Sequence, residues 1–115
     1  MSASRPLSRR LCDWVVRADD ANGVRTIVVS GELDLCAADE LAATLAAEYS
    51  DGGEIRVDLT GVTFIDAPIL GVLVRADQHL REQAGRLVLT GSGKRIKRLL
   101  HITGLDDLLA VEQVA

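Results

Sequence analysis

Segments typical of β-strands alternate with segments typical of amphipathic α-helices along this chain, and this order allows only a few folds. Residues 54–59 alternate apolar and charged side chains, which predicts a strand with one buried face. Residues 37–50 and 67–82 instead repeat apolar side chains at helical spacing. The pattern predicts parallel strands connected by helices for most of the chain.

The first two strands are predicted to pair as an antiparallel hairpin. The β-branched runs 11–18 and 24–30 are joined by Asp20-Ala21-Asn22-Gly23, and Asn-Gly is a strong signal for a tight turn between paired strands. The remaining pattern predicts a strand over 86–89, a helix over 93–101, and over 105–115 a helical turn with a final strand near 109–111. The predicted fold is α/β, with a mixed sheet of four to five strands and three to four helices. The N-terminal hairpin comes first in the chain and is followed by the βα units.

The ends of two helices carry glycine. Gly85 follows the helix predicted over 67–82 at the point where the chain must leave it, and Gly104 is predicted to end the last helix in a left-handed conformation. Hydrophobic residues make up 48% of the chain but aromatic residues only 3%, so the core is expected to be aliphatic. We expect one domain over residues 11–115 after a loose tail over residues 1–10.

Charge and composition favour a protein partner over a nucleic acid. The net charge is -4, whereas phosphate contacts need concentrated Lys and Arg. The basic run 94–98 indicates the solvent-facing side of an amphipathic helix, and a nucleic-acid or lipid patch is the alternative. No apolar run is long enough to span a membrane, and residues 1–10 lack the apolar core of a signal peptide, which predicts a cytoplasmic protein.

The cysteines and histidines suggest neither a metal site nor a catalytic site. Cys12 and Cys36 have no metal-ligand spacing, so free thiols are expected, with a redox link between them as the alternative. His79 and His101 fall on the polar sides of two different helices, without a nucleophile or carboxylate arranged around them by sequence. No cofactor is predicted.

The start of the helix at Ala67 is the strongest candidate for a functional surface. A helix N-terminus suits an anion or a docking partner, but Ala67 has no hydroxyl to modify and Pro68 has no amide to donate. The segment is therefore expected to act by contact. Asp66 is predicted to cap the helix by accepting from the Ile69 amide. Ile69 either turns inward onto the core or projects with Pro68 as an apolar knob.

Three motifs carry a resemblance to a known family. They are Gly31-Glu32-Leu33-Asp34, the run from Val57 through Val62-Thr63-Phe64-Ile65-Asp66, and Leu70-Gly71-Val72-Leu73. In this order and spacing, from about Leu11 to Val111, the chain resembles the STAS domain of bacterial anti-sigma factor antagonists. The resemblance implies the STAS fold and binding to an anti-sigma factor, itself a serine kinase, with release of a sigma factor for transcription.

The chain departs from that family at the helix start. The family's helix opens with D-S-[ST]-G-L-G, whose first Ser is phosphorylated by the bound kinase, whereas the matching stretch here is Asp66-Ala67-Pro68-Ile69-Leu70-Gly71. The resemblance thus implies an antagonist without the phosphorylation switch at position 67. Asp34 matches a family Asp near the same surface, and an Asx-type turn is its alternative role.

The resulting hypothesis is a binding protein whose partner surface comprises Asp34, Asp66, Ala67, Pro68 and Ile69. Two alternatives stay open. One is a STAS subunit that docks on the ATPase of an ABC-type lipid transporter, and the other is a nucleotide-binding or enzymatic role. The sequence does not specify an oligomeric state.

Overall fold

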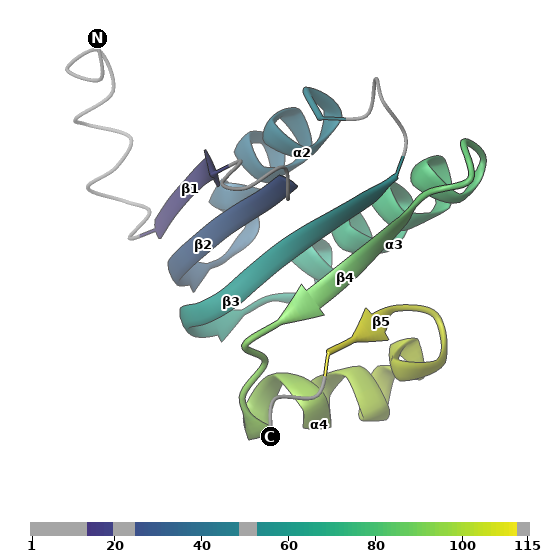
Figure 1. Ribbon diagram of the computed structural model, residues 1–115. Helices are drawn as coiled ribbons and strands as arrows, with labels where there is room; N and C mark the ends of the chain where they lie inside the picture. Colours follow the sequence, from purple (N-terminus) through teal and green to yellow (C-terminus); the bar gives the residue numbers. More distant parts are fainter. Residues whose placement is uncertain (1–13, 20–24, 49–52, 113–115) are drawn as a thin grey trace, which may run out of the picture.

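The computed structural model describes residues 14–19, 25–48 and 53–112, which form one five-stranded sheet in the order β1-β2-β3-β4-β5 (Figure 1). β1 (Trp14–Asp19) pairs antiparallel with β2 (Arg25–Leu33), and β3 (Glu54–Ile65), β4 (Arg86–Thr90) and β5 (Ala110–Val111) follow in parallel. The helical elements are η3 (Leu35–Ala37), α2 (Ala38–Ala46), α3 (Ala67–Arg81), α4 (Lys94–Thr103) and η5 (Leu105–Asp107). The predicted α/β class and the antiparallel start of the sheet are confirmed.

The core is aliphatic, as the composition predicted. Figure 1 shows α2 and α3 side by side behind the sheet and α4 beside its β5 edge. Alternate residues of β3 turn inward, and Ile55, Val57 and Leu59 are at most 1% exposed. The helices contribute a matching apolar stripe, which includes Leu41 and Leu45 of α2, Leu73 and Leu80 of α3, and Ile96 and Leu100 of α4.

β3 is longer than the strand predicted over 54–59, because its second half pairs with the end of β2 as far as Leu33 and Ile65. The pairing passes through register shifts beside Ser30 and Gly31. Gly31 has φ +88°, and a Cβ at Gly61 would lie 2.8 Å from the Ser30 Cβ, so both glycines are needed for this irregular pairing.

Two predicted helix boundaries also differ from the structure. The helix predicted over 37–50 begins two residues earlier, at Leu35, as η3, and its α-helical part ends at Ala46. At the end of α3 the left-handed residue is Ala84 (φ +62°) rather than Gly85, whereas Gly104 has the predicted left-handed conformation (φ +76°). Gly85 serves a different purpose, because a side chain at this position would overlap the backbone of Gly53.

Some expectations lie outside the described residues. They are the tail over 1–10, the turn at Asp20-Ala21-Asn22-Gly23, Cys12, and the last residues of the helix predicted over 37–50. Within the described part of the chain, no helix combines the length and the apolar character that a membrane crossing requires.

Asp77 is a buried carboxylate that connects α3 to β4. Its side chain is almost inaccessible, and the residue is 3% exposed. Oδ1 accepts a hydrogen bond from the Leu87 amide (2.9 Å), and Oδ2 accepts one from Arg81 Nε (2.7 Å). A buried charge is tolerated when hydrogen bonds and a cation compensate for the lost water, and Asp77 has both.

We expect Asp77→Ala to lower the free energy of unfolding by about 2–3 kcal/mol, because it leaves the buried Leu87 amide without an acceptor. Urea denaturation followed by circular dichroism measures this loss. Asp77→Asn is the matched control, since its amide oxygen can still accept from Leu87, and it should lose clearly less stability. Equal losses from both substitutions would contradict the assigned role of the Leu87 hydrogen bond.

Candidate functional site

The candidate site lies where β2 and β3 end side by side. Leu33 and Ile65 are paired residues of the two strands, and the Asp66 amide donates a hydrogen bond to the Leu33 carbonyl (3.0 Å). Asp34 and Asp66 are the next residues along their respective strands. The structure therefore brings these two predicted site residues together at one edge of the sheet.

Asp34 turns the chain from β2 into η3. Its Oδ1 accepts a hydrogen bond from the Cys36 amide (3.0 Å), so the Asx-type turn considered from the sequence is confirmed. The turn leaves Leu35 67% exposed and Cys36 exposed beside it. Neither residue was expected at this surface from the sequence, where Cys36 was considered only as a thiol. Leu35 lies outside the apolar stripe of the following helix, and this is the signal that could have revealed it.

Asp66 precedes α3 at the N-cap position, but its side chain does not cap the helix. The predicted bond from the Ile69 amide to the Asp66 carboxylate is wrong, because that amide donates to the Asp66 main-chain carbonyl instead (3.0 Å). Pro68 offers no amide to replace it. The half-buried Asp66 carboxylate accepts no hydrogen bond from the described part of the chain and remains available to an external donor.

The first turn of α3 divides into an exposed half and a buried half. Ala67 and Pro68 are exposed, whereas Ile69 is 0% exposed and belongs to the core. The inward orientation of Ile69 is confirmed, and the apolar knob is wrong, because the helical stripe through Leu73 includes Ile69. We name the exposed and half-exposed residues of this edge the Asp34–Pro68 surface; they are Asp34, Leu35, Cys36, Asp66, Ala67 and Pro68.

The Asp34–Pro68 surface combines two carboxylates with exposed apolar groups. It contains no histidine that could act as a base for the Cys36 thiol. His79 lies in α3 beside Gln83, and His101 Nδ1 lies 3.0 Å from Asp106 Oδ2 between α4 and η5. Among residues 14–19, 25–48 and 53–112, no cluster of three or more potential metal ligands occurs. The composition of the surface suits binding of a cationic, partly apolar partner.

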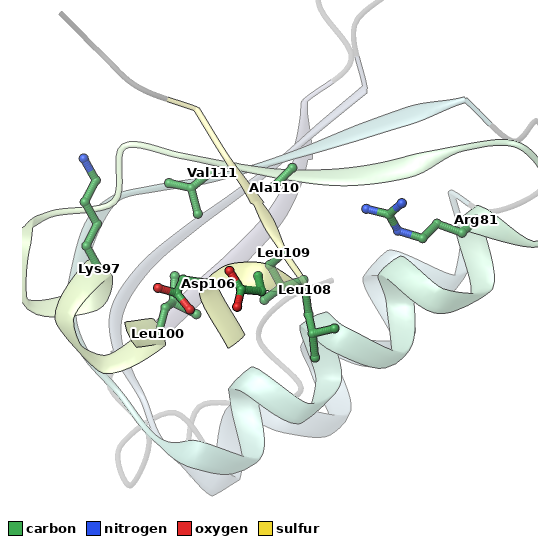
Figure 2. Close-up of a pocket in the computed structure, with 9 residues that line it drawn as sticks. Arg81, Lys97, Leu100, Asp106, Leu108, Leu109, Ala110 and Val111 are labelled. Atoms are coloured by element: carbon green, nitrogen blue, oxygen red, sulfur yellow. The ribbon is translucent and has the colours of Figure 1, made fainter. Parts of the chain in front are cut away.

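A separate cavity lies away from the Asp34–Pro68 surface. The cavity has a volume of about 510 Å³ and is lined by residues of α3, α4, η5 and β5. Leu100, Leu109 and Val111 are among these residues (Figure 2). Arg81 on its rim already pairs with Asp77. None of the residues that line this cavity belongs to the Asp34–Pro68 surface. The candidate site is therefore not located at this cavity.

Comparisons with known proteins agree with this architecture. The family profile described as "Mlab, STAS domain" matches residues 14–110. The anti-sigma-B factor antagonist of Listeria monocytogenes is 38% identical over 89 residues, which cover 76% of this chain and 78% of that protein. The protein of the same name in Bacillus subtilis is 32% identical over 83 residues, covering 72% and 76%.

A solved structure extends the likeness to three dimensions. The crystal structure of an anti-sigma factor antagonist from Mycobacterium paratuberculosis superposes with a TM-score of 0.77 at 26% identity, covering 88% of this chain and 86% of that one. The family match spans every strand and helix that frames the Asp34–Pro68 surface. With the family profile matching most of its length, this chain belongs to the STAS domain family.

Proposed function

We propose that this protein is an anti-sigma factor antagonist, which binds an anti-sigma factor of the serine-kinase type in the cytoplasm and so releases a sigma factor. The relatives named anti-sigma-B factor antagonist support this proposal, because the similarity covers about three quarters of both chains. The names of these relatives do not favour a transporter subunit. We propose binding as the whole of its activity, with no catalytic step of its own.

The observation that carries the proposal is the pairing of Leu33 with Ile65, which sets Asp34 and Asp66 side by side. The Asp66 carboxylate has no hydrogen-bond donor in the described part of the chain. An Arg or Lys of the partner would supply that donor, and a charge-assisted bond of this kind is stronger than a neutral one. Exposed Leu35 and Pro68 would add apolar contact area around the charge pair.

Isothermal titration calorimetry against the serine-kinase anti-sigma factors encoded by the source genome tests the proposed partner class. Submicromolar binding to one of them, with release of its sigma factor in size-exclusion chromatography, is the expected result. Failure of every such kinase to bind would overturn the proposal.

The protein is expected to remain unphosphorylated when incubated with the partner kinase and ATP, since Ala67 offers no hydroxyl at the exposed helix start. Intact-mass spectrometry measures the result. Ala67→Ser is the matched variant: it places a hydroxyl on the same exposed position and should gain one phosphate, with weakened binding. Stoichiometric phosphate on the wild-type protein, for example at exposed Thr63, would contradict the proposal that this antagonist lacks a phosphorylation switch.

A further inference from the structure

We infer that the protein has a second protein-binding site, a groove between the end of β3 and the start of α4 that accepts an extended acidic segment of a partner by strand addition. The groove has a volume of about 440 Å³ and is lined by residues 62–65 of β3, by Gly93 just before α4, and by residues 94–96 and 99 of α4. None of these residues belongs to the Asp34–Pro68 surface. The inference does not depend on the partner being an anti-sigma factor.

The backbone of β3 is open along this groove. β4 pairs with β3 only from Glu54 to Asp58, whereas β3 continues to Ile65. In the described structure no other strand takes the place of β4 beyond Asp58. Unpaired amides and carbonyls at a strand edge are a ready template for another extended chain. This favours a polypeptide as the occupant over a lipid or a small molecule.

The charges on α4 select an acidic segment. Its exposed cations Lys94, Arg95, Lys97 and Arg98 form no ion pair with the described residues. By contrast Arg17, Arg56, Arg81 and Arg86 each pair with a carboxylate. Because the whole chain carries a net charge of -4, this unpaired cluster is a local exception. Lys94 and Arg95 line the groove itself, so acidic side chains lying in it would find complementary charges.

The walls of the groove provide an apolar contact. Ile96 is 6% exposed, and Leu99 packs against the core. Phe64 is 50% exposed, although a large aromatic side chain is usually covered. An exposed aromatic residue beside a concave apolar wall is the composition found at the centres of protein interfaces. The favoured occupant therefore alternates acidic and apolar residues, as an added strand would.

Selection of a phage library of random dodecapeptides on the full-length protein tests this inference. Enriched peptides should alternate acidic and apolar residues, and on binding should shift the amide resonances of residues 61–65 in the ¹⁵N-labelled protein. The double variant Lys94→Glu/Arg95→Glu should weaken their binding by about tenfold or more. It should leave the fold intact, because neither side chain has a partner in the described chain.

The variant Lys97→Glu/Arg98→Glu is the matched control. It makes the same change of charge on the same helix, but neither residue lines the groove, so binding should weaken by less than about threefold. Four results would overturn the inference: no enrichment, enriched peptides without acidic residues, equal losses from the two variants, or amide shifts confined to the Asp34–Pro68 surface. Concentration-dependent dimerisation that closes the same edge would also overturn it, by making a second copy the occupant.

Discussion

Gly85→Ala is expected to lower the free energy of unfolding by about 3 kcal/mol or more, because the new methyl group has no space. A Cβ at Gly85 would lie 2.2 Å from the Gly53 carbonyl oxygen and 2.8 Å from the Gly53 nitrogen. Both are backbone atoms, so no side chain can move away to relieve the overlap. The same Gly53 carbonyl accepts a hydrogen bond from the Arg86 amide (3.0 Å), at the point where β4 begins beside β3. The substitution therefore separates two neighbouring strands of the sheet.

Gly71→Ala is the matched control, because it adds the same methyl group but is not expected to lower the free energy of unfolding. Gly71 lies inside α3, and a methyl group there would have as its nearest neighbour the flexible end of the Arg75 side chain, 3.3 Å away. Alanine in a helix interior is more favourable than glycine by about 0.5–1 kcal/mol, so stability should rise or stay unchanged. Urea denaturation of the two variants measures the difference. A loss at Gly85 no larger than the change at Gly71 would contradict the close approach to Gly53.

The sheet and its helices could be predicted from the sequence because their signals are local. Alternation over residues 54–59 and helical spacing over residues 67–82 each reflect which face of one segment is buried. The second half of β3 gives no such signal, because its pairing depends on Gly31 and Gly61, which come from two different strands. The role of Gly85 is hidden for the same reason, since the atom that excludes a side chain there belongs to Gly53.

The sequence indicated that Asp34 and Asp66 follow two strands of the sheet, but not whether they share one surface or which hydrogen bonds they form. Neighbouring parallel strands end at one edge of a sheet, and the structure sets Asp34 and Asp66 there. Asp66 has the extended backbone typical of a capping residue, so the orientation of its side chain decides whether the carboxylate can accept from the Ile69 amide. The sequence does not reveal that orientation, and in the structure the main-chain carbonyl is the acceptor. Because the Asp66 carboxylate does not cap the helix, it is available for binding a partner.

Asp66→Arg is therefore expected to weaken binding to the anti-sigma factor by about a hundredfold, close to 3 kcal/mol, while the protein stays folded. The substitution replaces an available carboxylate with a cation that would repel a basic partner group. No hydrogen bond to the described chain is lost, and the unfavourable charge at the helix start should cost at most about 1 kcal/mol of stability. Titration calorimetry gives the affinity, and thermal denaturation checks the fold.

Two further variants separate a specific contact at Asp66 from a general effect of charge. Glu82→Arg makes the same change of charge at the exposed far end of α3, and we expect it to leave the affinity within about threefold of wild type. Asp66→Asn keeps the shape of the side chain and removes only its charge, so an intermediate loss of about tenfold is expected if a cation of the partner approaches the carboxylate. An affinity of Asp66→Arg equal to that of Glu82→Arg would show that the partner does not contact Asp66.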